Sequence, residues 1–247
     1  MADAFPDNQW TTLKVRMESD GPEQVIAFIE TFDEDRRVAL YQFARKGFAF
    51  QDWEGKNWDG HIAVCCAGIE EMLRQDCVEQ ANLLAYNLAA DLAPCWPGDD
   101  MVRETHHFEV GVDLADNCLQ WRADLEKGPD AFSIAHWVRG IHLLALECAE
   151  DAAEAFGESF DCAIEDAEAN GSPSGVTVDA PDGLVLASGY WGLGQWAANE
   201  SGGEKRYREA IAIFENKMRV EGADQADLQF YIDQLEKVRQ MCLGNDQ

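Results

Sequence analysis

Apolar residues recur along most of this chain at intervals of three and four positions. Such spacing places side chains on one face of a helix. Alternating β-branched segments bounded by turns are absent apart from the short run 176–178. The pattern therefore predicts an all-α protein made of stacked antiparallel helix hairpins, arranged as an α-solenoid or a helical bundle. Two of the clearest stripes are Ile141, Leu144, Ala145, Cys148 and Ala152, and Leu228, Tyr231, Ile232, Leu235, Val238 and Cys242.

Glycine, proline and acidic turn signals divide this pattern into about ten helices. Two prolines and a glycine within residues 93–98 predict a firm stop, and residues 170–183, rich in Gly, Ser, Pro and Asp, predict a mobile loop. We expect one all-helical domain over residues 1–247, with 1–98 and 99–247 as its N-terminal and repeat-like sub-units. The expected helical segments are 7–19, 22–32, 34–48, 59–74, 77–92, 99–126, a hairpin over 130–169, 183–199, 203–220 and 223–243.

A faint internal repeat supports the hairpin interpretation. In each copy a glycine marks a close crossing of helices, and a large aromatic residue follows about five and a half turns later. Hairpins that cannot bury their apolar faces alone stack on their neighbours, so the repeat favours a binding scaffold over a catalytic pocket. Three positions recur at a constant offset of 54 residues: Trp137, Gly140 and Phe160 are matched by Trp191, Gly194 and Phe214.

The segment from Tyr207 to Met218 resembles the second helix of the tetratricopeptide repeat, with Ala210 and Phe214 at its small and aromatic positions. Small residues let the two helices of a hairpin approach, and the aromatic residue fills the gap to the next hairpin. Further matches are Leu193-Gly194, similar to the Leu-Gly pair of the first helix, and Tyr86, Ala89 and Pro94, at the spacing of the second helix and its terminating proline.

The chain also departs from that family. The offset of 54 residues exceeds the usual 34 of the repeat. About four extra residues between the matched helices require residues 199–203 to bulge. The resemblance implies a curved stack of hairpins with a concave face for protein or peptide recognition, without catalysis or a cofactor.

The net charge of the chain limits the kinds of partner that it can bind. The chain has 47 acidic and 19 basic residues, a net charge of −28. Nucleic-acid binding is excluded because phosphate contacts need clustered Lys and Arg. Two interpretations remain: an acidic solvated surface of a salt-adapted proteome, in line with seven Lys against twelve Arg, or an acidic face that attracts a basic partner.

The sequence gives no sign of a membrane or secreted protein. Its longest apolar stretches, such as 62–68, fall short of the roughly 20 residues that cross a bilayer. The acidic N-terminus lacks the basic and apolar regions of a secretion signal, so we expect a cytoplasmic protein. The eight cysteines include no Cys-x-x-Cys motif, and we expect reduced, buried thiols.

Two groups of residues are candidates for partner binding. An acidic run is expected along one helical face, either as a solvated surface or as a docking site for a basic peptide. An aromatic group is expected either as a contact patch, since aromatic residues dominate interface hot spots, or as core packing. The acidic run comprises Glu147, Glu150, Asp151, Glu154 and Glu158, and the aromatic group comprises Trp53, Trp58 and Trp96.

Glu104 and His107 are a candidate metal site. Their Glu-x-x-His spacing places both on one helical face, as in carboxylate-bridged di-iron bundles, but a second such motif is missing. The alternative is that the histidine is simply hydrogen-bonded.

No nucleophile or phosphate-loop motif appears. We therefore expect a protein- or peptide-binding scaffold without a cofactor. An immunity- or antitoxin-like protein that neutralises a basic toxin domain, and a metal-dependent helical enzyme, are the alternatives.

Overall fold

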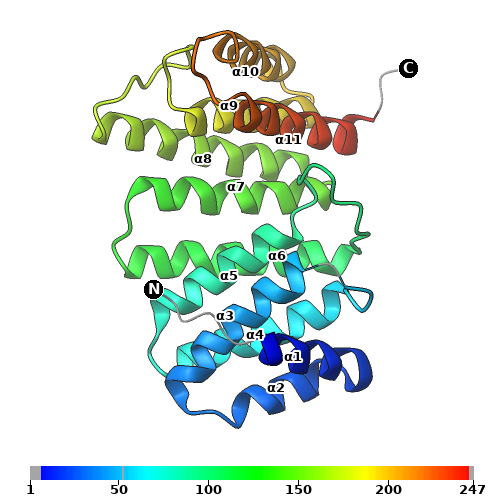
Figure 1. Ribbon diagram of the computed structural model, residues 1–247. Coiled ribbons are helices and arrows are strands. Elements are labelled where there is room, and N and C mark those ends of the chain that lie inside the picture. The colour runs from blue at the N-terminus through cyan, green and yellow to red at the C-terminus, as the bar shows by residue number, and fades with distance from the viewer. Residues whose placement is uncertain (1–6, 52, 245–247) are drawn as a thin grey trace. The chain divides into compact units, whose positions relative to one another are not determined.

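The computed structural model describes residues 7–51 and 53–244, which form eleven α-helices and no β-strand (Figure 1). The predicted all-α class is confirmed, and the run 176–178 lies in a loop. The helices are α1 (Asp7–Asp20), α2 (Pro22–Glu30), α3 (Glu34–Phe50), α4 (Trp58–Arg74), α5 (Val78–Leu92), α6 (Thr105–Asp124), α7 (Pro129–Ala145), α8 (Ala149–Ala169), α9 (Asp182–Ala197), α10 (Gly203–Lys217) and α11 (Gln225–Leu243).

Helix α6 begins later than predicted. The helical stretch expected from residue 99 is wrong at its start, because Asp99 organises a non-helical turn. One carboxylate oxygen of Asp99 accepts from the backbone N–H of Met101 at 3.0 Å, and the other pairs with Arg103 at 2.5 Å. Local side-chain to backbone bonds of this kind compete with helix formation. The first residue of the helix is Thr105, after Glu104 at its N-cap.

The chain divides into two compact units, Met1–Leu92 and Ala93–Gln247. The division falls just after α5, whereas the sequence placed it at residue 98, at the far end of the same Pro-rich turn. The N-terminal unit holds α1 to α5, in which α4 packs against α2, α3 and α5. Its core is mainly apolar, and its largest fully buried side chains include Leu40, Tyr41, Met72, Leu84 and Leu88.

The C-terminal unit is a succession of antiparallel neighbours. Helix α6 packs on α7, α7 on α8, α8 on α9 and α9 on α10, while α11 packs on α9 and α10. In Figure 1 the green helices α7 and α8 run side by side with the yellow α9 beyond them. Phe156, Tyr190 and Phe214 are fully buried within this unit. The predicted hairpin over residues 130–169 corresponds to α7 and α8.

The repeated residues occupy matching places in two hairpins. Each glycine lies on a first helix, α7 or α9, and each aromatic residue lies on the second, α8 or α10. The ring of Phe160 lies 5.2 Å from that of Trp191 on the next helix, α9. The ring of Phe214 likewise lies 5.5 Å from that of Tyr231 on the next helix, α11. In both copies the aromatic residue therefore joins its hairpin to the helix that follows.

The loop over residues 170–183 is tied to α10 at its end. The ammonium of Lys217 donates to the backbone carbonyl of Ala180 and to the carboxylate of Asp182, the latter at 2.5 Å. These contacts connect the start of α9 to α10. Across residues 7–51 and 53–244, no helix combines the length and apolar character needed to span a bilayer.

An acidic groove between two helices as the candidate functional site

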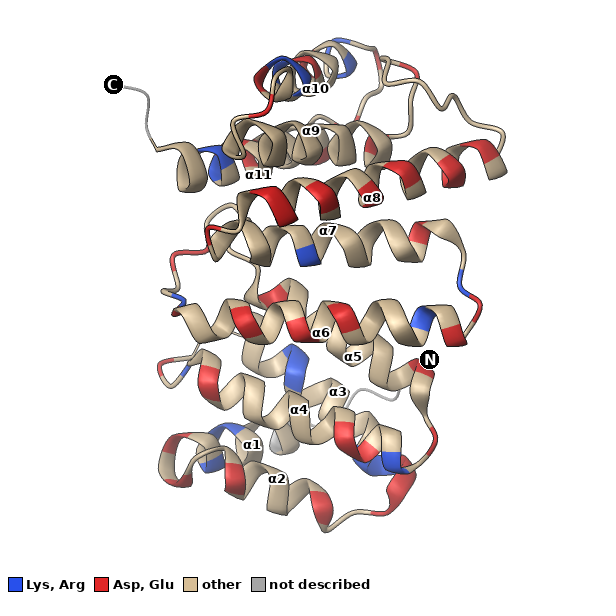
Figure 2. Cartoon of the chain, turned by 180° about the vertical axis from the view of Figure 1, so that it is seen from behind, with Lys and Arg blue, Asp and Glu red and all other residues tan. Residues whose placement is uncertain are grey.

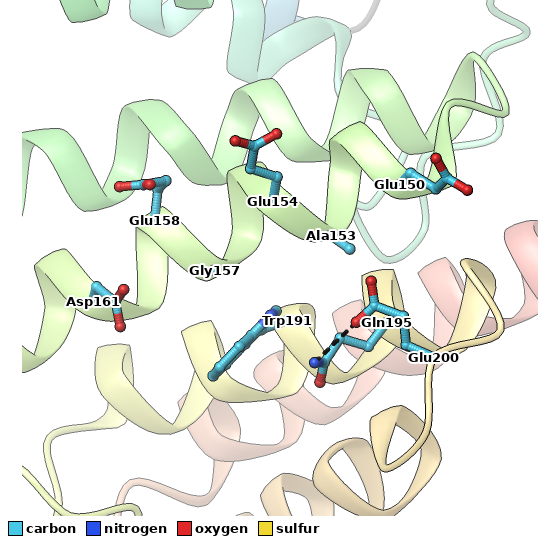
Figure 3. A pocket seen from close by; sticks show the side chains of 9 residues that line it. All are labelled: Glu150, Ala153, Glu154, Gly157, Glu158, Asp161, Trp191, Gln195 and Glu200. Atoms are coloured by element: carbon cyan, nitrogen blue, oxygen red, sulfur yellow. Dashed lines mark hydrogen bonds between the residues drawn. The ribbon is translucent and has the colours of Figure 1, made fainter.

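A groove of about 280 Å³ lies between α8 and α9 in the C-terminal unit (Figure 3). Its α8 wall uses positions three or four residues apart, which share one side of a helix. The opposite wall comes from α9 and from the turn that leads to α10. The lining residues are Glu150, Ala153, Glu154, Gly157, Glu158 and Asp161 on α8, Trp191 and Gln195 on α9, and Glu200 in the turn.

The α8 wall carries four exposed carboxylates that the protein does not neutralise. Figure 2 shows acidic positions recurring along α8. Within the described part of the chain, the side chains of these four residues accept no hydrogen bond and form no ion pair. Elsewhere in the chain, basic side chains form ion pairs with carboxylates, as Arg45 does with Asp91 and Arg239 with Glu236. The four residues are Glu150, Glu154, Glu158 and Asp161.

Trp191 forms the aromatic part of the opposite wall. Its indole packs against α8 at Gly157, where a Cβ would lie 3.4 Å from the indole nitrogen Nε1. The guanidinium of Arg206 lies 3.7 Å from the Trp191 ring centroid, within cation–π distance. Burial lowers the pKa of Arg206, against the opposing effect of Glu209. Trp191 is thus held between α8 and α10, with its position fixed from both sides.

Gln195 connects Arg206 to the fifth carboxylate of the groove. Its Oε1 accepts from Nε of Arg206 at 3.2 Å, and its Nε2 donates to the Glu200 carboxylate at 3.2 Å. The second of these bonds is drawn in Figure 3. Glu200 lies in an exposed turn, and this bond holds its carboxylate at the edge of the groove. The groove consequently carries negative charge on both walls, an arrangement suited to ammonium and guanidinium groups.

Three of the five predicted acidic residues line this groove: Glu150, Glu154 and Glu158. The prediction that Glu147 continues the same helical face is wrong. Glu147 has a φ of 62° and lies in the turn before α8. The backbone N–H of Cys148 bonds back to the carbonyl of Leu143 at 2.9 Å, a helix-ending arrangement that needs a left-handed residue. Asp151 is exposed on α8 but does not line the groove.

The aromatic candidates lie elsewhere. Trp53 is 8% exposed and packs at 5.6 Å from the Phe48 ring, and Trp58, the first residue of α4, is 7% exposed. Trp96 is half-buried, and its ring is stacked on Phe230 at 6.2 Å. Burial of Trp53 and Trp58 favours the core-packing alternative for both, since little of either ring is available to a partner.

Glu104 and His107 meet as a helix cap. Glu104 has extended backbone angles at the N-cap of α6, so the prediction that both residues lie on one helical face is wrong. The backbone N–H of Glu104 donates to Nδ1 of His107 at 2.9 Å, the contact that a capping box makes with its third helical residue. His107 is 4% exposed. The pair therefore has a structural role that the Glu-x-x-His spacing alone does not reveal.

A buried polar cluster in the N-terminal unit escaped the sequence analysis. Asp91 on α5 accepts from Nε of Arg45 at 2.7 Å and from Nε2 of His61 at 3.2 Å. The Sγ atom of Cys65 lies 4.0 Å from the same Nε2. In a catalytic triad the acid and the nucleophile bind opposite nitrogens of the imidazole, which is not the case here. Burial raises the pKa of Cys65 and keeps its thiol neutral.

The sequence analysis also missed Asp161 on the α8 wall and the whole of the opposite wall. Asp161 follows Glu158 by three residues, so the helical period offered a signal for it. Trp191 was recognised only as a repeat position. Gln195 and Glu200 reach the groove through the packing of α9 on α8, which no local pattern encodes.

Comparisons with protein-family models, with curated proteins and with solved structures find no match to this chain. The resemblance to the tetratricopeptide repeat therefore stays a prediction. Neither a family nor a function follows from similarity.

Proposed function

We propose that the C-terminal unit binds a basic segment of a protein or peptide in the groove between α8 and α9. One observation carries the proposal: five carboxylates and a tryptophan surround a single hollow on the surface of a helix-hairpin stack. A chain with 47 acidic residues and 19 basic ones must leave many carboxylates unpaired. What distinguishes these five is that they line one groove from two sides.

The spacing of the acidic residues supports an extended peptide as the ligand. Glu150, Glu154 and Glu158 follow one another at four-residue intervals, which corresponds to a separation of about 6 Å along the helix. Alternate side chains of an extended chain point the same way and are about 6.6 Å apart. A segment with Arg or Lys at every second position would therefore place its cations opposite successive carboxylates.

Electrostatics set the expected strength of binding. Each exposed ion pair contributes about 0–1 kcal/mol, so affinity must come from several pairs acting together. Because exposed charges are screened over about 8–10 Å at moderate salt, binding should weaken as salt is added. A basic toxin domain would be one partner of this kind. We find no feature of the groove that favours a metal-dependent reaction over this binding role.

To test the proposal, the full chain is titrated into a labelled peptide that has arginine at every second position. Binding is measured as the change in fluorescence anisotropy of the peptide. The test variant Glu154→Gln/Glu158→Gln removes two groove carboxylates. The matched control Glu165→Gln/Glu168→Gln removes the same charge from exposed positions of α8 outside the groove. We expect the groove variant to bind about tenfold more weakly, equivalent to about 1.4 kcal/mol, and the control to bind nearly as the parent does. Equal weakening in both would show that only net charge matters and would overturn the proposal.

A further inference from the structure

We draw no further inference here: the strongest candidate, the buried cluster of Arg45, His61, Cys65 and Asp91 where α3, α4 and α5 meet, carries nothing beyond helix packing, because Cys65 and Asp91 meet the same imidazole nitrogen and all four side chains are closed to solvent.

Discussion

Gly194 of α9 lies directly against Phe156 of α8. A Cβ at Gly194 would come within 2.9 Å of the Phe156 ring and within 2.8 Å of the Cα of Ala153. From the other side, a Cβ at Gly140 of α7 would lie 2.6 Å from the same ring. Phe156 thus occupies the space left by two glycines that the sequence repeat pairs. The glycines hold equal repeat positions but face different neighbours, one inside its hairpin and one between hairpins.

Replacing Gly194 with alanine should therefore destabilise the C-terminal unit. The new methyl group would meet the backbone of Ala153, which cannot rotate away, so we expect a loss of about 1–3 kcal/mol from overpacking. Gly183→Ala is the matched control, because it lies on the same helix and nothing stands within 4 Å of its added Cβ. Urea denaturation measures both. Unchanged stability of Gly194→Ala would mean that the helices do not approach this closely.

The α8 wall of the groove was predictable because a helical period is local. Glu154 and Glu158 share a face whatever lies opposite, and the prediction of an acidic stripe needed nothing else. The same argument failed at Glu147, where the closing turn of the hairpin adopts a left-handed conformation, and at the start of α6, where Asp99 accepts from the backbone N–H of Met101 outside any helix. Both errors concern helix ends, at which turn conformation and local hydrogen bonds outweigh periodicity.

The opposite wall was beyond sequence reasoning for a different reason. Trp191 meets Gly157 only because α9 packs on α8. The loop over residues 170–183 separates these two helices along the chain, so the packing itself decides the register between them. The repeat correctly paired Phe160 with Phe214 but did not show that Phe160 contacts Trp191. Similarly, His61 and Cys65 are one helical turn apart, whereas Asp91 joins them only through the packing of α5 on α4.

Filling the groove without altering its charge should weaken peptide binding. Gly157→Leu puts a branched side chain next to Trp191, in a helix interior where leucine is favoured over glycine by nearly 1 kcal/mol. We expect a folded protein that binds the arginine peptide at least about tenfold more weakly. Gly157→Ala should keep full binding, because its Cβ makes only ordinary contact with the indole. Parent-like binding by the leucine variant, with circular dichroism confirming its helices, would place the peptide elsewhere.

Buried thiols should make the protein sensitive to alkali. Burial raises the pKa of Cys118 from 9.0 to about 12, opposed weakly by Arg122. Above pH 9 the unfolded chain loses this proton while the folded chain keeps it, so the stabilising contribution is complete below pH 9 and disappears as the pH rises towards 12. The expected loss is about 1.4 kcal/mol per pH unit for this group.

The variant Cys118→Ala isolates this contribution. Its cost in stability should be about 1.4 kcal/mol smaller at about pH 10 than at about pH 8, because the parent alone must keep this thiol protonated. Urea midpoints at both pH values provide the measurement. The cavity left by the sulfur costs the same at either pH and cancels in the comparison. An equal cost at the two pH values would show that Cys118 is ionised without penalty.

Asp91 should be essential for the stability of the fold only while Arg45 is present. Asp91→Leu leaves the guanidinium of Arg45 buried without its carboxylate partner, and removal of one member of a buried pair costs about 3–5 kcal/mol. The double variant Arg45→Met/Asp91→Leu removes both charges, and replacement of a buried pair by apolar residues of similar volume is close to neutral. His61 loses its acceptor in both variants, so the difference between them reports on Arg45. Denaturation of the two proteins should show recovery of most of the lost stability in the double variant. If both were equally unstable, the loss would come from the geometry of the Asp91 hydrogen bonds rather than from an uncompensated charge.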